Sequence, residues 1–433
     1  MTVAALEGPA GSGKTHRLME ELQQHLQRRP LQNHQRVLAL TFMHGSRRRL
    51  DARLGEIEGG HGRWFEAATV DSFAWRIVQR WRALARARGY EIPGERQYNQ
   101  TCALGAALLE RPEVRSWVAA TCPVVIIDEA QDLNDARSRM IAALARKCDV
   151  FLAFDDFQCL NLALLPIAVR EWLGEHCEPA TLTGCRRTDD AELIEAALAL
   201  REGRDLQLEG GRRFKVAVRD GRAPYFTAAA TLANAIRWRG DDGSFAFLTP
   251  SRQGGFADTL VDLVSSRSIG RHNSGPYRIA WENTEEANAA RLWDELEFPD
   301  RCSVAEALAF LESHRGEPAL RAVREWLRRQ QNTIGMEEIS AAEARRYFDR
   351  VTAQRRRFGA QREPTYTAMT IQQAKNREFD HVVVAWPFAV RDDDEQKRRL
   401  LYNAITRARR SCMVLVQAQR LVETPPFVAM ADG

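Results

Sequence analysis

Short, uninterrupted apolar runs recur along the chain, separated by segments in which apolar residues recur every three or four positions. The clearest runs are Val3–Leu6, Val124–Ile127, Phe245–Leu248 and Met413–Val416. Helical spacing follows the first run, at Leu18, Leu22 and Leu26. Uninterrupted apolar runs are typical of strands buried in a parallel sheet with helices on both faces. The pattern therefore predicts an α/β chain built on parallel sheets.

A glycine-rich segment, Gly8–Thr15, joins the first predicted strand to the first predicted helix. Strand, glycine loop and helix in this order predict a phosphate-binding loop. The glycines let backbone N–H groups close on phosphates, and the helix N-terminus adds its positive dipole. We expect Lys14 to contact the β- and γ-phosphates and the Thr15 hydroxyl to hold Mg²⁺. The predicted nucleotide contacts are Gly8, Gly11, Ser12, Gly13, Lys14, Thr15 and His16.

Two carboxylates, Asp128 and Glu129, end the second apolar run. The C-terminal ends of parallel strands meet the ligand in folds of this kind, so Asp128 is predicted to hold Mg²⁺. Glu129 is placed to act as the general base that polarises the attacking water. Taken alone, the pair could also be an ordinary acidic helix cap. Beside a phosphate loop, it favours nucleotide hydrolysis over nucleotide binding alone.

The segment Asp128–Asp132 resembles motif II of the UvrD/Rep/PcrA family of superfamily 1A DNA helicases. The other motifs of that family are matched in order along the chain. The matching segments are Leu38–Phe42 for motif Ia, Thr69–Phe73 for Ib, Phe154–Gln158 for III, Leu182–Arg187 for IV, Thr370–Phe379 for V and Leu401–Arg409 for VI. The order of these segments across nearly the whole chain carries the resemblance, rather than any one of them.

The resemblance implies two tandem RecA-like P-loop domains that hold ATP between them. It implies that Gln158 couples the γ-phosphate to the DNA site, and that Arg186 and Arg407 reach the γ-phosphate from the second domain. Positive charge is needed there because negative charge spreads over the phosphate oxygens in the transition state. Arg187 is the alternative to Arg186, and a surface helix position is the alternative interpretation of Arg407. Glu378 would contact the nucleotide sugar.

The motifs divide the chain into four parts. These are RecA-like domain 1A at residues 1–75 and 122–180, a reduced helical 1B subdomain at 76–121, RecA-like domain 2A at 181–280 and 361–433, and a reduced helical 2B subdomain at 281–360. The last part carries an apolar stripe at helical spacing, formed by Leu320, Val323, Trp326 and Leu327. Such a stripe is more often a core than a binding surface.

Several positions depart from the family's pattern. No glutamine precedes Gly8, and Cys185 stands where relatives carry a tyrosine that stacks on adenine. Selectivity among nucleoside triphosphates is therefore open, with ATP expected. After Gln158 the chain lacks the aromatic residues that stack on successive bases in relatives, and Phe157 or Trp172 are the alternatives.

The predicted contacts with a nucleic-acid strand are Phe42, Ser72 and Gln372. Phe42 matches the motif Ia aromatic, whereas Gln372 replaces the motif V histidine and Asn376 replaces a glycine. Stacking on an aromatic side chain contributes about 1–3 kcal/mol per base, so the loss of two such positions would weaken binding by roughly 2–6 kcal/mol.

Composition adds little to this picture. The net charge of +4 is mild, although arginines cluster at residues 47–49, 76–88 and 355–357. Such clusters either contact the phosphates of a nucleic-acid backbone or form a solvated helix face. The eight cysteines include no Cys-x-x-Cys pair, which argues against a zinc or iron–sulfur site. With no leader or membrane-spanning run evident, we expect a cytoplasmic protein.

The leading prediction is an ATP- and Mg²⁺-dependent translocase or helicase on single-stranded DNA, with RNA as the alternative track and 3′→5′ polarity implied by the resemblance. The alternative is a nucleic-acid-sensing regulatory ATPase subunit, with little unwinding of its own. It would serve a complex for phage defence or DNA repair, with a partner such as a nuclease. A small-molecule phosphoryl transferase would leave Arg407 and the Asp128–Asp132 segment unexplained.

Overall fold

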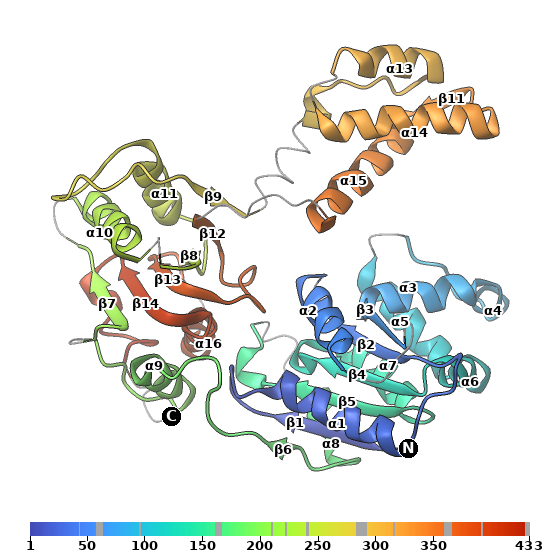
Figure 1. The fold of residues 1–433 in the computed structure, drawn as a ribbon, viewed down its shortest axis with the longest axis horizontal. Helices are drawn as coiled ribbons and strands as arrows, with labels where there is room; N and C mark the ends of the chain where they lie inside the picture. The colour runs from blue at the N-terminus through green and yellow to red at the C-terminus, as the bar shows by residue number, and fades with distance from the viewer. Residues whose placement is uncertain are drawn as a thin grey trace.

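Two six-stranded parallel sheets form the body of the protein, and a small helical unit extends from the second (Figure 1). The structure is a computed structural model. It describes residues 1–42, 44–57, 64–94, 97–160, 167–208, 211–220, 223–239, 242–282, 292–314, 317–358, 366–390 and 393–428. The side chains of Arg48, Arg49 and residues 355–357 lie outside this description, as does the segment 161–166 that follows motif III.

The first sheet has the strand order β3-β2-β4-β5-β1-β6, and every neighbouring pair is parallel. Its strands are β1 Val3–Glu7, β2 Val37–Thr41, β3 Phe65–Thr69, β4 Val124–Asp128, β5 Asp149–Phe154 and β6 Ala180–Thr181. Its helices are α1 Lys14–Arg28, α2 His44–Gly55, α3 Val70–Arg80, α4 Arg82–Ala87, α5 Tyr98–Leu109, α6 Pro112–Thr121, α7 Asp135–Ala145 and α8 Ile167–Gly174. The short 3-10 helices η1 Ala130–Asp132 and η2 Asp156–Gln158 follow β4 and β5.

Strand β4 shows why the apolar runs are uninterrupted. Val124 and Ile126 belong to the core on the face that α1 and α2 cover, whereas Val125 and Ile127 belong to the core on the opposite face. Successive side chains of a strand point to opposite faces, so a strand covered on both sides needs an apolar residue at every position. The prediction of a two-sided parallel sheet is confirmed.

The helices α4, α5 and α6 and the second half of α3 lie within residues 76–121, and their buried side chains belong to the core of the first sheet. Ile77 of α3, Leu108 of α5 and Val118 of α6 are buried in one cluster with Leu40 and Ile127 of the sheet. These helices therefore form one covering layer of the first domain, because their apolar faces pack on the sheet rather than on each other alone. Sequence spacing could not distinguish such a layer from an inserted subdomain.

The second sheet repeats the arrangement with the order β7-β14-β13-β8-β12-β9, again parallel throughout. Its strands are β7 Phe214–Val218, β8 Phe245–Thr249, β9 Ile279–Trp281, β12 Tyr366–Thr370, β13 Phe379–Trp386 and β14 Ala408–Val416. The helices α9 Ala191–Arg201 and α16 Asp394–Ile405 share one core with this sheet, and α10 Pro224–Arg239 and α11 Phe256–Ser266 share the other. The 3-10 helix η4, Gln419–Leu421, lies near the C-terminus. The two sheets with their helices confirm the fold class of tandem RecA-like domains.

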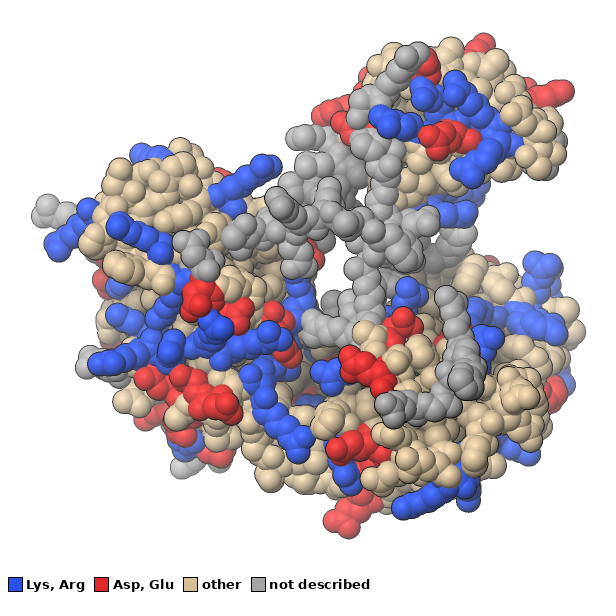
Figure 2. Space-filling model, in the orientation of Figure 1, with Lys and Arg blue, Asp and Glu red and all other residues tan. Residues whose placement is uncertain are grey.

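The helical unit contains α13 Val304–Glu312, α14 Pro318–Ile334 and α15 Ala341–Phe358, with β10 Arg301–Ser303 and β11 Glu338–Ser340 paired antiparallel. Leu320, Val323 and Leu327 are fully buried in its core, as the apolar stripe predicted. Trp326 stacks on Tyr347 with ring centroids 4.4 Å apart. The unit stands apart from both sheets in Figure 1, and Figure 2 shows charged side chains of both signs on its surface. In the described parts of the chain, no helix is long and apolar enough to cross a membrane.

Candidate nucleotide site between the two sheets

The phosphate loop follows β1 and leads directly into α1. Gly11 and Gly13 have φ values of 79° and 89°, a left-handed backbone that glycine adopts without steric cost. Lys14 is almost completely buried, and its ammonium donates to the carbonyl oxygens of Gly8 at 2.8 Å and Pro9 at 3.1 Å. The Ser12 hydroxyl is buried and has no hydrogen-bond partner among the described residues. The loop thus brings an ammonium, a hydroxyl and a helix N-terminus into one short segment, the groups that an anion site uses.

Thr15 and Asp128 meet across the loop, as the sequence predicted for a pair of Mg²⁺ ligands. The Thr15 hydroxyl donates to the Asp128 carboxylate at 3.0 Å. Burial, followed by the charge of Glu129, raises the pKa of Asp128 to about 6. A hydroxyl and a poorly solvated carboxylate are oxygen ligands of the kind that Mg²⁺ prefers, so these residues fit the ion.

Glu129 adopts φ 64° and ψ 44°, a left-handed conformation that is uncommon for a residue with a side chain. It lies where β4 ends and η1 begins, and the Gln131 side-chain amide donates to its carboxylate. The other end of the Gln131 amide accepts from the backbone N–H of Asp155 at 3.1 Å. The predicted general base is therefore held in place by a fully buried glutamine that is itself anchored at the end of β5.

The segment after β6 lies directly on the phosphate loop. The backbone N–H of Arg186 donates to the Gly11 carbonyl at 2.6 Å. A Cβ atom added to Gly13 would lie 3.0 Å from Cδ of Arg186, so the side chain of this exposed arginine crosses the loop at that glycine. Arg187 instead donates to Glu378 at 3.0 Å and to the Thr406 carbonyl at 2.7 Å. Both arginines lie against the loop, because a Cβ atom added to Gly11 would lie 2.9 Å from Cβ of Arg187, but the guanidinium at Gly13 is that of Arg186.

Arg407 is the second arginine predicted to reach the nucleotide, and it is 2 % exposed. Its guanidinium donates to neutral oxygens of Asn403 at 3.0 Å, Thr406 at 3.1 Å and Arg377 at 3.4 Å. Burial, followed by the charge of Arg187, lowers the pKa of Arg407 to about 9, although Glu129 counteracts this shift. Arg407 is thus a desolvated cation for which an added anion would be stabilising.

Glu378 was predicted to contact the nucleotide sugar. In the structure its two carboxylate oxygens accept from Arg187 at 3.0 Å and from Arg409 at 2.8 Å. It therefore positions Arg187 beside the loop in this arrangement of the domains. His16, the last of the predicted nucleotide contacts, is exposed on α1 and lies 3.3 Å from Glu20.

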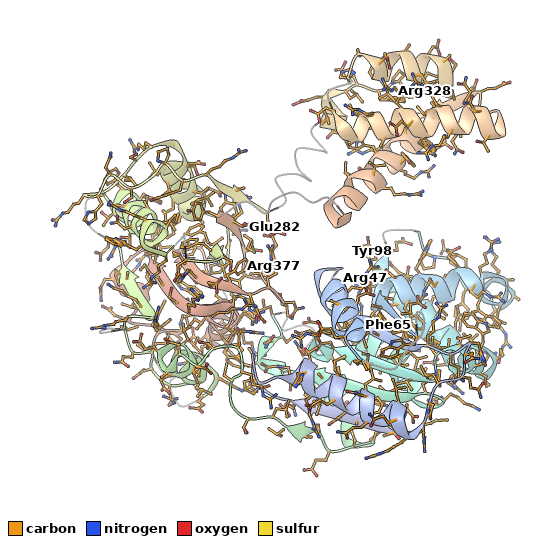
Figure 3. All side chains as sticks on the ribbon, in the orientation of Figure 1. Arg47, Phe65, Tyr98, Glu282, Arg328 and Arg377 are labelled. Atoms are coloured by element: carbon orange, nitrogen blue, oxygen red, sulfur yellow. The ribbon has the colours of Figure 1, made fainter. Side chains whose placement is uncertain are left out.

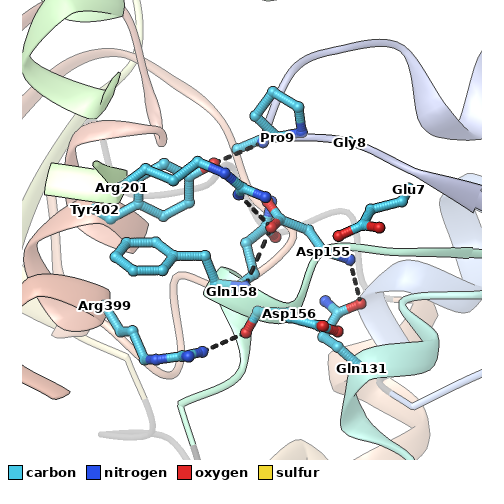
Figure 4. A network of polar contacts seen from close by, with 12 residues as sticks. Glu7, Gly8, Pro9, Gln131, Asp155, Asp156, Gln158, Arg201, Arg399 and Tyr402 are labelled. Atoms are coloured by element: carbon cyan, nitrogen blue, oxygen red, sulfur yellow. Dashed lines mark hydrogen bonds and ion pairs between the residues drawn. The ribbon is translucent and has the colours of Figure 1, made fainter. Parts of the chain in front are cut away.

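The sequence interpretation missed a set of contacts between the two domains. The carboxylate of Asp155, at the start of η2, accepts from Arg201 of α9 at 2.6 Å and from Tyr402 of α16 at 3.2 Å (Figure 4). Lys375 lies 2.6 Å from both carboxylate oxygens of Asp132. Tyr402 and Lys375 lie inside matched motifs, which was a usable signal, whereas Arg201 lies in a helix without any motif.

Gln158, predicted to couple the γ-phosphate to the strand, donates from its buried side-chain amide to Asp155 at 3.1 Å. Its neighbour Phe157 packs edge-on against Tyr402, with centroids 5.0 Å apart, and beneath the guanidinium groups of Arg201 and Arg399. Phe157 is therefore part of the contact between the domains, and in this arrangement its ring is engaged by side chains of the second domain.

An apolar cavity of about 110 Å³ lies beside the loop. The residues that line it come from the loop, the segment after β6, α9 and α16; they include Pro9, Cys185, Leu193, Ala197 and Ile405. Cys185 lines this cavity at the position where a larger tyrosine was expected from the family, so part of the space follows from that exchange.

The predicted nucleic-acid contacts lie at the C-terminal edges of the two sheets. Phe42 follows β2, Ser72 lies in the first turn of α3, and Gln372 is exposed after β12. Because Thr41 and Thr69 are paired in register, Phe42 and Ser72 lie at neighbouring strand ends. Phe42 is partly buried against the first core, and the Ser72 hydroxyl lies 2.7 Å from that of Thr69.

Asn376, which replaces a glycine of the family, has φ 63°. Asparagine tolerates this left-handed conformation better than other residues with a side chain, so the exchange preserves the backbone of the loop.

Figure 3 shows Arg47 and Tyr98 on the first domain and Arg377 and Glu282 on the second, on facing sides of the space below the helical unit. Tyr98 is 56 % exposed there and was not recognised from the sequence.

Comparison with known proteins agrees with this geometry. Residues 1–219, slightly more than half of the chain, match the family described as AAA domain, and residues 365–415 match the UvrD-like helicase C-terminal domain. No curated protein sequence matches the chain. A chain of the solved structure described as "The structure of PRRSV helicase" is similar at 12% identity with a TM-score of 0.38, and the match covers 99% of this chain and 56% of that one. The chain spans little more than half the length of that helicase chain. By the match over residues 1–219, the chain belongs to the AAA domain family, and the match over residues 365–415 supports its resemblance to UvrD-like helicases of superfamily 1.

Proposed function

We propose that the protein hydrolyses ATP between its two RecA-like domains and uses the cycle to move along single-stranded DNA. The observation that carries the proposal is the placement of Arg186 on the phosphate loop, together with a buried Arg407 within electrostatic reach of Glu129. Arg186 crosses the loop at Gly13, and the guanidinium of the buried Arg407 donates to neutral oxygens of Asn403, Thr406 and Arg377. Both follow the first sheet in the chain, so a catalytic site that uses them is complete only when the two domains are together.

Each side chain then has a defined part in hydrolysis. Lys14 would exchange its carbonyl partners for phosphate oxygens, and Glu129, held by Gln131, would accept a proton from the attacking water. Thr15 and Asp128 would hold Mg²⁺, which neutralises developing charge on the phosphates when bound. Arg407 would stabilise the charge that spreads over the γ-phosphoryl oxygens, a contribution of about 10³–10⁵ in rate for such arginines.

The strand is proposed to pass along the C-terminal edges of the two sheets, over Phe42 and Ser72 and then Gln372. Movement in the 3′→5′ direction is part of the proposal and rests on the family resemblance. We also propose that residues 281–360 are a reduced 2B subdomain, supported by the separate core of the helical unit.

The test is ATP hydrolysis by the purified chain with and without a 40-nucleotide single strand, at low and moderate salt. We expect stimulation that weakens as salt rises, because phosphate contacts release counterions. A tailed duplex added next distinguishes translocation from unwinding. Hydrolysis that is indifferent to DNA and RNA strands would refute the proposal.

A second candidate, a regulatory ATPase subunit that senses nucleic acid for a partner such as a nuclease, is favoured by one observation. Phe157 is committed to the contact between the domains, which leaves fewer aromatic side chains for the strand. Efficient unwinding by the isolated chain would argue against this candidate. Strand-stimulated hydrolysis without unwinding, restored by a co-purifying partner, would favour it.

A further inference from the structure

Asp155 lies at the centre of a buried polar cluster that joins both domains. Its side chain is 0 % exposed and accepts from four donors: the guanidinium of Arg201, the hydroxyl of Tyr402, the side-chain amide of Gln158 and the backbone N–H of Phe157. A carboxylate buried to this degree is tolerated because each lone pair has a partner. Two of its four donors belong to the second domain.

The Tyr402 hydroxyl makes two hydrogen bonds, one as an acceptor and one as a donor. The hydroxyl accepts from the backbone N–H of Ala10, in the phosphate loop, at 2.8 Å, and donates to Asp155 at 3.2 Å. Tyr402 is 1 % exposed, and its ring is fixed edge-on against Phe157. One side chain of the second domain therefore bonds to the loop that holds the phosphates and to the carboxylate beside Gln158.

The same cluster continues to the general base. The backbone N–H of Asp155 donates to Gln131 at 3.1 Å, and the Gln131 amide donates to Glu129. Figure 4 shows Gln131, Asp155, Gln158, Arg201 and Tyr402 arranged around this point. Hydrogen bonds thus connect the phosphate loop, Gln158 and Glu129 through Asp155, and the connection to the loop exists only while the second domain contributes Tyr402.

We propose that Tyr402, Asp155 and Arg201 are positioning residues that align Gln158 and Glu129 for hydrolysis when the domains are together. The inference rests on the proposed ATPase function and adds the element that makes chemistry depend on domain contact. Without the Tyr402 hydroxyl, the Ala10 N–H loses its acceptor and Asp155 loses one of two bonds from the second domain. The carboxylate is then held by three donors instead of four, so Asp155 and the Gln158 amide that bonds to it are positioned less firmly.

The central variant is Tyr402→Phe, which removes one oxygen atom and keeps the ring that packs on Phe157. The matched control is Tyr225→Phe. The Tyr225 hydroxyl accepts from Gln417 at 3.2 Å in the same domain, away from the phosphate loop. We expect Tyr402→Phe to lower kcat 10- to 100-fold and to change the KM for ATP less than threefold, with Tyr225→Phe unchanged in both. Arg201→Lys, which keeps the charge beside Asp155, should retain more of kcat than Arg201→Met.

The outcomes separate this inference from the proposed function. A wild-type chain that hydrolyses ATP without stimulation by single strands overturns the translocase, whereas the kcat and KM comparison still judges the positioning residues. Equal kcat in Tyr402→Phe and Tyr225→Phe overturns the inference, and so does a parallel loss of thermal stability and kcat, which indicates a purely structural role. As a second measurement, domain closure on adding a non-hydrolysable ATP analogue is followed by energy transfer between labelled domains. We expect Tyr402→Phe to close less completely than the control, and equal closure together with equal kcat would refute the inference.

Discussion

The ion pair between Asp132 and Lys375 offers the sharpest test of how the domains hold together. Asp132 lies in η1 of the first domain and Lys375 after β12 of the second, and the ammonium lies 2.6 Å from both carboxylate oxygens. The side chains are 20 % and 8 % exposed, so solvent screens the pair only in part. The perturbation is the set Asp132→Asn, Lys375→Met and the double variant.

The expected magnitude follows from two opposing contributions. At this distance and an effective dielectric constant of about 20, the gross attraction is about 6 kcal/mol. Desolvation works against it, since burial raises the pKa of Asp132 in spite of the attraction of Lys375. We therefore expect a coupling free energy of about 1–3 kcal/mol, which is about 5- to 150-fold in the equilibrium between closed and open domains.

The assay is the affinity for a non-hydrolysable ATP analogue, measured by calorimetry for the wild type and the three variants. The exposed pair of Arg410 and Asp242, 2.9 Å apart within the second domain, provides a control double-mutant cycle. We expect its coupling free energy to be below about 1 kcal/mol and the affinity for the ATP analogue to be unchanged. If the effects of Asp132→Asn and Lys375→Met simply add, within about 0.5 kcal/mol, the pair does not hold the domains together and the reasoning fails.

Three further outcomes are expected. Arg407→Ala should reduce single-turnover hydrolysis 10³- to 10⁵-fold with nucleotide affinity little changed, whereas Arg410→Ala, three residues further on in β14, should hydrolyse normally. A loss below tenfold would rule out the transition-state role. Because burial raises the pKa of Asp128 to about 6, the folded chain binds a proton between about pH 4 and pH 6 that the unfolded chain lacks. In the absence of Mg²⁺, the contribution of Asp128 to the free energy of unfolding should therefore fall by on the order of 2–3 kcal/mol as the pH rises from 4 to 7. Over the same pH range the affinity of the protein for added Mg²⁺ should rise, because the carboxylate becomes ionised. Denaturant titrations that give Asp128→Asn the same pH slope as the wild type would contradict this. Phe42→Ala should weaken binding to a single strand about 5- to 150-fold with basal hydrolysis retained. Unchanged affinity in a fluorescence titration would show that Phe42 does not contact the strand.

The sequence by itself determined the parts of the protein that depend on local order. A buried strand, a glycine loop and a helix must follow each other to make a phosphate site, so Gly8–Thr15 could be recognised without coordinates. The uninterrupted run Val124–Ile127 likewise required a strand covered on both faces, which the structure shows.

Tertiary structure alone decided which side chains meet across the two domains. Arg186 and Arg187 are adjacent in sequence and chemically identical, and only packing brings the first to Gly13 and the second to Glu378. Arg201 lies 46 residues from Asp155 in a helix without a motif, and no local pattern records their contact. Residues 76–121 show the same limit, because helical spacing reports which face is apolar but not which surface covers it. Contacts between distant segments arise from the fold as a whole, so they have no signature in the spacing of any one segment.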